Sequence, residues 1–300
     1  MSIYVTADID AFIAYLQFEK RYSKLTSRAY RDDLHAFAAF LMDQFGEDSI
    51  TSASQVAIRS WLAYQRDAGM QPRTLHRKLS SLKSFFKFMM RQGRLNVNPA
   101  GTLSAPKMNK RLPVFVAEQA MQDLFSGIEF PEGWEGVLHE TILKLFYATG
   151  MRLSELVNLK TSQIDFGKQS IKILGKGNKE RVIPFTADLS EILQRYVQEQ
   201  SKQQGVDAVP HFFVREDGTP LTPRSIQYFV KKYLSQVTTL ERKSPHVLRH
   251  SFATHLMNHG ADLNAVKELL GHSSLASTQV YTHTTIEQLK AIHAKAHPRS

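Results

Sequence analysis

The chain has 300 residues, no cysteine and a formal net charge of +10, with 38 Lys and Arg against 28 Asp and Glu. The lack of Cys excludes disulfides, zinc ribbons and thiol catalysis, and no run approaches the roughly 18 apolar residues that span a bilayer. Because no secretion signal opens the sequence, we expect a cytoplasmic protein of about two domains, whose basic charge suits a polyanionic partner.

Apolar residues recur at helical spacing through the first hundred residues. A first stripe covers residues 9–16. Steps of three and four over residues 30–45 predict a second helix, with Thr26 as its N-cap and Gly46 at its end. A third helix is expected over residues 53–67.

A fourth helix is expected over residues 79–91, where apolar residues fill one face and basic residues recur on another. Further basic and hydroxyl side chains cluster just ahead of it. Side chains and free backbone N–H groups at the start of a helix can both reach phosphates. We therefore expect DNA contacts in this region from Arg73, Thr74, Arg77 and Lys78, and elsewhere in the first domain from Arg28.

The helical region ends at Asn98-Pro99, and the stretch that follows is rich in proline and basic residues without apolar periodicity. Such a composition is typical of a linker. We expect residues 104–113 to connect a first domain over residues 1–103 to a second over residues 114–300.

The second domain combines helices with short strands. Helical spacing predicts a helix over residues 135–149 and another that opens near Met151. Short strands are expected over residues 163–165, 171–174 and 181–184. The predicted fold is therefore mostly α, with a helical N-terminal domain and a larger α+β domain that carries a small antiparallel sheet.

Five short motifs follow one another along the second domain. They are ATGMRLSE around Arg152, GKGNKER before Val182, HVLRH with His246 and Arg249, LGH ending at His272, and VYTH around Tyr281. Together they resemble the signature of the tyrosine recombinases, the phage integrase and Xer group, and the first domain resembles the SAM-like core-binding domain of that family. One box alone would be weak, but the ordered set is specific and the resemblance covers essentially the whole chain.

The resemblance implies an enzyme that cuts and rejoins DNA at specific sites. In that family a tyrosine attacks a phosphodiester and leaves a 3′-phosphotyrosine, and a free 5′-hydroxyl later reseals the strand by a second transesterification. Carried onto this chain, the catalytic residues are Arg152, Lys176, His246, Arg249, His272 and the nucleophile Tyr281.

Two arginines suit the chemistry of this reaction. A guanidinium is always charged and donates in a bidentate manner to phosphate, so Arg152 and Arg249 can stabilise the charge that develops in the transition state. We therefore expect no metal, no ATP and no other cofactor. Glu155, one helical turn beyond Arg152, is expected to orient basic partners.

The remaining roles concern protons. The resemblance implies that Lys176 is the general acid that protonates the leaving 5′-oxygen, with Lys179 and Arg181 as rivals. His246 is expected to accept the tyrosine proton and His272 to hydrogen-bond the scissile phosphate, because imidazole can both accept and donate.

The expected partner is double-stranded DNA, held by the DNA contacts named above and also by Lys179, Arg181 and Arg224. Residues 286–293 predict an amphipathic helix, and the resemblance implies that it packs into a neighbouring protomer of a homo- or hetero-tetramer on two sites. The GKGNKERVIP hairpin and the HPR ending are similar to the Xer group. This implies resolution of chromosome dimers at a dif-like site during segregation and cell division, in a nucleoid-associated protein that works with a second Xer recombinase and a DNA translocase.

Several alternatives stay open at this point. An integrase or transposase-type recombinase of a mobile element would use the same chemistry, and a type IB topoisomerase shares the phosphotyrosine step. A non-catalytic DNA-binding factor need not keep all six catalytic groups. The pairs His246/His250 and His255/His259 are spaced as zinc ligands on one helical face, but HExxH is absent.

Overall fold

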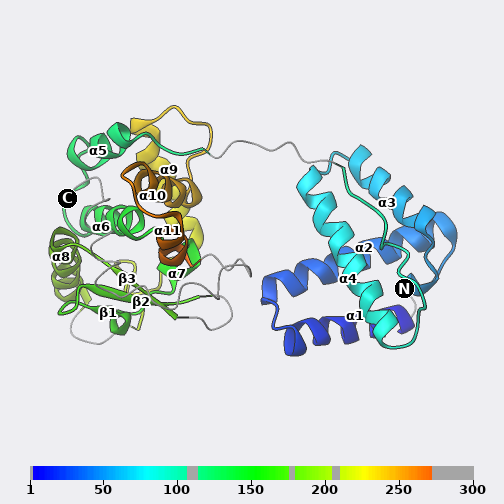
Figure 1. Cartoon of the computed structure of the whole chain (residues 1–300). Helices are drawn as coiled ribbons and strands as arrows, with labels where there is room; N and C mark the ends of the chain where they lie inside the picture. Colours follow the sequence, from blue (N-terminus) through cyan, green and yellow to red (C-terminus); the bar gives the residue numbers. More distant parts are fainter. Residues whose placement is uncertain (1–2, 107–113, 176–179, 205–209, 272–300) are drawn as a thin grey trace. The chain divides into compact units, whose positions relative to one another are not determined.

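The computed structural model describes residues 3–106, 114–175, 180–204 and 210–271, apart from the side chains of residues 3–5 and 203–204. The chain divides into two compact units, Met1–Arg111 and Leu112–Ser300 (Figure 1). Most of the expected linker, residues 107–113, lies outside the described residues, as does the expected C-terminal helix. Among the described helices, none is long and apolar enough to cross a membrane.

The first unit is helical, as the sequence predicts. Its helices are α1 (Ile3–Ala14), α2 (Lys24–Phe45), α3 (Gln55–Asp67) and α4 (Pro72–Arg91), with a short π-helical turn at Tyr15–Glu19 and a 3-10 turn at Ile50–Ser52. The prediction of Thr26 as N-cap of α2 is wrong. Ser23 has the extended backbone of a cap, and its hydroxyl accepts the N–H of Thr26 at 3.2 Å. Gly46 ends α2 with φ of +66°, as expected.

The core of the first unit lies between α4 and the other helices. Phe85 and Phe86 of α4 are fully buried, with Phe12 of α1 and Trp61 of α3. The chain after α4 belongs to this core as well, since Ala100 and Leu103 are buried in it. The carbonyl of Pro106 bonds the ring of His76 at 2.7 Å, so the start of the expected linker lies against the first unit.

The second unit contains seven described helices and one small sheet. The helices are α5 (Glu118–Ser126), α6 (Trp134–Thr149), α7 (Leu153–Val157), α8 (Ala187–Gln204), α9 (Pro223–Val237), α10 (Pro245–Asn258) and α11 (Leu263–Leu270). The strands are β1 (Ile164–Asp165), β2 (Ser170–Leu174) and β3 (Glu180–Pro184), preceded by a 3-10 turn at Thr161–Gln163. The mostly α fold with a small sheet is therefore confirmed.

The sheet is antiparallel, in the order β1-β2-β3. Ile171 pairs with Ile183, and both are buried on the face that packs on the helices. Helix α6 is buried on almost every side and contacts α8 and α10. Strand β3 contacts α11, which brings the sheet, α7 and the ends of α6 and α11 into one region (Figure 1). The candidate site lies there.

Candidate active site

The corner between α6 and α7 places Arg152. Helix α6 ends at Gly150, whose φ of +55° is left-handed. A side chain at this position would not fit, because its Cβ would lie 2.3 Å from the ring of Phe252 and 2.9 Å from Leu270. The glycine therefore allows a sharp turn, two residues before Arg152 becomes the N-cap residue of α7.

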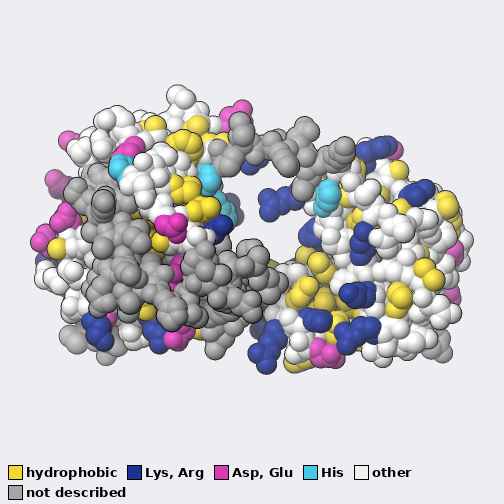
Figure 2. Space-filling model, in the orientation of Figure 1, with side chains coloured by type: hydrophobic (Ala, Val, Ile, Leu, Met, Phe, Trp, Pro, Cys, Tyr) yellow, Lys and Arg dark blue, Asp and Glu magenta, His cyan; other side chains and the backbone are white. Residues whose placement is uncertain are grey.

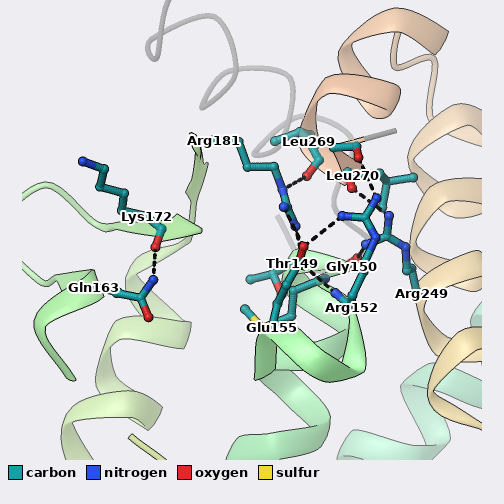
Figure 3. Close-up of polar contacts among 12 residues, drawn as sticks. Thr149, Gly150, Arg152, Glu155, Gln163, Lys172, Arg181, Arg249, Leu269 and Leu270 are labelled. Carbon is teal, nitrogen blue, oxygen red and sulfur yellow. Dashed lines mark hydrogen bonds and ion pairs between the residues drawn. The ribbon is translucent and has the colours of Figure 1, made fainter. Parts of the chain in front are cut away.

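Glu155 stands at the centre of the polar contacts in Figure 3. Its carboxylate accepts the backbone N–H of Arg152 at 2.7 Å and Nη1 of the same residue at 2.9 Å. Arg181 of β3 donates to both of its oxygens, through Nη1 at 2.9 Å and Nη2 at 2.7 Å. Four donors match the roughly four lone-pair positions of a carboxylate, so the hydrogen-bonding capacity of Glu155 is filled.

These contacts keep Glu155 ionised. Burial is the largest single influence and raises its pKa, but the hydrogen bonds from Arg181 and Arg152 and the charge of Arg181 together outweigh burial and lower the pKa to about 2. The carboxylate is therefore negative throughout the neutral range, between two guanidinium groups.

The C-terminus of α11 supplies a second set of acceptors. The carbonyls of residues 269–271 each accept from a different arginine: Arg181 Nε at 2.8 Å, Arg249 Nη2 at 2.7 Å and Arg152 Nη2 at 2.6 Å, in that order. The last carbonyls of a helix have no partner within it and carry partial negative charge. We call these three carbonyls the α11 collar; with Glu155 it holds three like charges close together.

Arg249 is buried in this cluster. It comes from α10, is 8% exposed, and also donates Nη1 to the carbonyl of Gly150. Burial first, and then the charge of Arg152, lower its pKa to about 10. The guanidinium remains protonated at neutral pH, and its site therefore favours an additional negative group.

Exposure separates the arginines of this cluster. The side chain of Arg152 is 33% exposed, whereas that of Arg181 is 9% exposed. His246, in the first turn of α10, is exposed and lies three positions before Arg249. Among the predicted catalytic residues that the structure describes, Arg152 and His246 are thus the ones that solvent, or a ligand, can reach most easily.

Four predicted site residues, Lys176, Lys179, His272 and Tyr281, lie outside the described residues. Of the predicted DNA contacts, Arg28, Arg73 and Arg224 are exposed and Thr74 is half-buried. Lys and Arg side chains are spread over the face of the first unit seen in Figure 2.

Lys78 is in a different position from the one we expected. It is 7% exposed, its ammonium lies 3.3 Å from Asp33, and it stands 5.0 Å from the ring centroid of Trp61. Arg77 is half-buried and donates to the same aspartate and to the carbonyl of Ala29. A buried carboxylate needs such partners, so Lys78 is corrected from a phosphate contact to a core ion pair.

Arg181 also differs from expectation. As a rival general acid or DNA contact it would need a free face, but its Nε, Nη1 and Nη2 all donate within the protein. Of the spaced histidines, His255 and His259 have protein partners too. Nδ1 of His255 bonds the hydroxyl of Tyr147 at 2.8 Å and its Nε2 bonds the carbonyl of Val116 at 2.9 Å, while His259 pairs with Glu118.

Comparison with known proteins decides the family. Residues 115–288 match the model described as "Phage integrase family", and residues 9–93 match "Phage integrase, N-terminal SAM-like domain". The chain belongs to the phage integrase family. It is a site-specific tyrosine recombinase, an enzyme of DNA strand transfer.

Curated relatives extend over nearly the full length of this integrase-family chain. A protein of Bacillus pumilus named tyrosine recombinase XerC is 39% identical over 298 residues, which cover 97% of this chain and 96% of the relative. A Bacillus subtilis protein of the same name is 38% identical, with 97% and 96% covered.

Solved structures share the fold. One is the XerH site-specific recombinase bound to palindromic difH substrate in a post-cleavage complex, with a TM-score of 0.71, 24% identity, and 89% of this chain and 78% of that one covered. Another is the Tn1549 transposon integrase in complex with transposon right end DNA, with a TM-score of 0.70, 21% identity, and 94% and 97% covered. At these identities the likeness concerns the fold alone.

Sequence reasoning missed the backbone acceptors of this recombinase site. The carbonyl of Gly150 and the α11 collar orient two of the predicted catalytic arginines. Every residue has a backbone carbonyl, so a sequence does not show which ones act as acceptors. The available signal was indirect: Gly150 and Gly271 each follow a helical stripe, as helix-ending glycines do.

Proposed function

We propose that this enzyme is a Xer-type recombinase that resolves chromosome dimers at a dif-like site during segregation and cell division. One observation carries the catalytic part of the proposal. Arg152 and Arg249, far apart in the sequence, donate to consecutive carbonyls of the α11 collar, so their guanidinium groups are gathered at one place. The relatives named XerC support the choice of the Xer group.

In the proposed first step, the phenolic oxygen of Tyr281 attacks the scissile phosphorus. His246 takes the phenolic proton, a 3′-phosphotyrosine bond forms, the bond to the 5′-oxygen breaks, and Lys176 gives that oxygen a proton. In the second step a 5′-hydroxyl from the partner duplex attacks the phosphotyrosine and releases the tyrosine. Each step breaks one phosphodiester bond and forms another, so the reaction needs no energy from ATP hydrolysis.

The charged residues have a separate task in this scheme. Arg152 and Arg249 counter the negative charge on the non-bridging oxygens, with His272 as a further donor. Protein acceptors hold both arginines in place, which suits a transition state, because donors that are already oriented need no reorganisation during the reaction.

The proposed partner is double-stranded DNA, gripped through exposed basic residues such as Arg28, Arg73 and Arg224. We further propose a tetramer on two sites, joined through residues 286–293, that works with a second Xer recombinase and a DNA translocase. Such an enzyme acts on the nucleoid in the cytoplasm. We also propose residues 104–113 as the linker between the two domains.

The first experiment is incubation with a nicked duplex that carries a candidate dif-like site, in the presence of a chelator. Wild type is expected to form a protein–DNA adduct that survives denaturation, and Tyr281→Phe is expected to bind the DNA without forming it. Tyr228→Phe is the matched control, since Tyr228 is 64% exposed and has no proposed role.

Each outcome has a distinct meaning. An adduct that persists in Tyr281→Phe contradicts the nucleophile. An adduct on the ends of a mobile element but not on any dif-like site contradicts the chromosomal role and favours a mobile-element recombinase. No adduct on any DNA that the protein binds favours a non-catalytic factor.

A further inference from the structure

We infer that Arg181 is a positioning residue of the recombinase, which holds Arg152 in place through Glu155 and fixes the end of α11 that both catalytic arginines contact. The inference rests on the proposed role of Arg152 at the phosphate. Arg181 is not one of the six predicted catalytic residues.

Arg181 is unsuited to act on DNA directly. All three of its guanidinium nitrogens already donate within the protein, to the carboxylate of Glu155 and the carbonyl of Leu269. Arg249 is also buried, but the bonds described for it use only Nη1 and Nη2. Arg152 is 33% exposed and keeps a face towards solvent. Any effect of Arg181 on the reaction must therefore pass through its neighbours.

The first path runs through Glu155. A bidentate pair fixes the plane of a carboxylate as well as its position, and here the pair joins β3 to α7. The same carboxylate then accepts both the backbone N–H and Nη1 of Arg152. Arg181 thus determines where Glu155 lies, and Glu155 determines where Arg152 points.

The second path runs through α11. Arg181 donates Nε to the carbonyl of Leu269, the first carbonyl of the collar. It also packs against Gly271, where a Cβ would lie 3.1 Å from Nη1 and 3.2 Å from Cδ of the arginine. The glycine leaves room for this guanidinium under the end of the helix, and the next two carbonyls of the collar hold the two catalytic arginines.

A lysine would not reproduce this arrangement. An ammonium is a compact point charge, whereas the planar guanidinium reaches two carboxylate oxygens and a carbonyl from one group. Removing the charge of Glu155 separates two effects of losing Arg181: the misplacement of Arg152 and the loss of folding stability. Loss of Arg181 leaves a buried carboxylate with too few partners, which destabilises the fold. Replacing Glu155 by Gln at the same time removes the unpaired charge. It does not restore the contacts by which Arg181 positions Arg152.

The experiment measures single-turnover adduct formation at saturating enzyme, on the DNA with which wild type reacts, together with DNA affinity and the unfolding midpoint. The variants are Arg181→Lys, Arg181→Met and the double variant Arg181→Met/Glu155→Gln. The matched control is Lys172→Met on the same hairpin, which removes a surface ion pair to Glu180 with side chains 58% and 55% exposed.

We expect Arg181→Met to slow adduct formation by about 100-fold, the order of loss for one misplaced electrostatic donor, with DNA affinity changed less than about threefold. Arg181→Lys should recover only part of the rate. The double variant should unfold at a higher midpoint than Arg181→Met but react no faster. Arg181→Met should add little to the defect of Arg152→Ala, since the two act through one path. Lys172→Met should react like wild type.

A second measurement uses DNA with an uncharged methylphosphonate at the scissile position. If Arg181 acts by orienting a group that counters phosphate charge, the defect of Arg181→Met shrinks on this substrate. The inference is overturned if the double variant recovers the rate together with stability, or if Arg181→Met and Arg181→Lys are as fast as wild type. Full activity of Arg152→Ala or Tyr281→Phe would instead overturn the proposed function, whatever Arg181 does.

Discussion

Arg181 and Glu155 form a bidentate ion pair, with nitrogen to oxygen distances of 2.9 and 2.7 Å, between strand β3 and helix α7. The same carboxylate is shared with Arg152. Without it, three guanidinium groups would meet at the end of α11 with only backbone carbonyls as acceptors. The ion pair therefore reduces the repulsion among the three arginines, so that the folded state tolerates them. The cluster still carries a net positive charge, which can bind a phosphate.

The first prediction concerns acid stability. The pKa of Glu155 in the folded protein is about 2, below its ordinary value of 4.5. A lowered pKa in the folded state means that the stabilisation is present above about pH 4.5 and is lost as pH falls towards 2. Its size at neutral pH is on the order of 3 kcal/mol.

Chemical denaturation of wild type and Glu155→Gln at pH values from 2 to 6 measures this effect. The variant should be less stable than wild type at neutral pH, and the difference should narrow as the solution is acidified. A difference that stays constant with pH would contradict the lowered pKa.

Much of the fold follows from patterns that the sequence contains. Apolar residues at spacings of three and four predict α2, because they bury one face of the helix. Gly46 predicts its end, because glycine adopts a left-handed backbone without strain. The strands are predictable from short alternating runs, and Ile171 and Ile173 are buried as alternation requires. The N-cap of α2 was misplaced because Ser23 and Thr26 can both cap, and periodicity does not choose between them.

The site could be predicted only in part. The spacing of Arg152 and Glu155 on a short helix predicts their contact. Long-range partners are different, since Arg181 reaches Glu155 from another element, and a basic residue beside a motif can equally face DNA or the interior. Lys78 illustrates the same limit: its place at a helix start suited phosphate, but Asp33, distant in sequence, determines its position in the core.

The second prediction separates that core ion pair from DNA binding. Lys78→Met should destabilise the first unit by up to about 3 kcal/mol, since it takes a partner from Asp33, which is 2% exposed, while Arg77 remains paired. Lys87→Met on the same helix removes the same charge from an exposed position and should change stability by less than about 0.5 kcal/mol.

DNA binding should depend on exposed basic residues and not on the buried Lys78. Arg73→Ala, an exposed change, should lower the slope of log affinity against log salt by about one. Lys78→Met, measured well below its unfolding midpoint, should keep the wild-type slope. A reduced slope for Lys78→Met would return this lysine to the set of phosphate contacts.

The third prediction concerns the turn before Arg152. Gly150→Ala should cost about 2–5 kcal/mol, because it combines a left-handed backbone with a Cβ that would lie 2.3 Å from the Phe252 ring. Gly260→Ala is the control, since its φ is +83° but no atom lies within 4 Å of the added Cβ; its cost should be the backbone strain alone, about 1–2 kcal/mol. Thermal denaturation compares the two, and equal losses would contradict the steric argument.

The fourth prediction concerns a buried histidine in the second unit. His139 of α6 is 1% exposed, its Nδ1 lies 2.9 Å from the hydroxyl of Tyr233, and the ring of Phe229 packs against it. Burial first, and then the charge of Lys232, lower its pKa to about 4. Glu135 lies 3.8 Å from Nε2, which would favour protonation, but its side chain is 63% exposed, so water screens this attraction and burial dominates.

The sign of the pH effect follows from that lowered pKa. The unfolded chain binds a proton at His139 near pH 6.5 and the folded chain does so only near pH 4, so stability is complete above 6.5 and declines as pH falls through this interval. The loss approaches about 3 kcal/mol once pH is below 4. His139→Gln keeps a polar partner for Tyr233 and does not titrate, so its unfolding free energy should vary less between pH 7 and 4 than that of wild type. If the two proteins lose stability in parallel over this interval, the buried neutral histidine is not the group responsible.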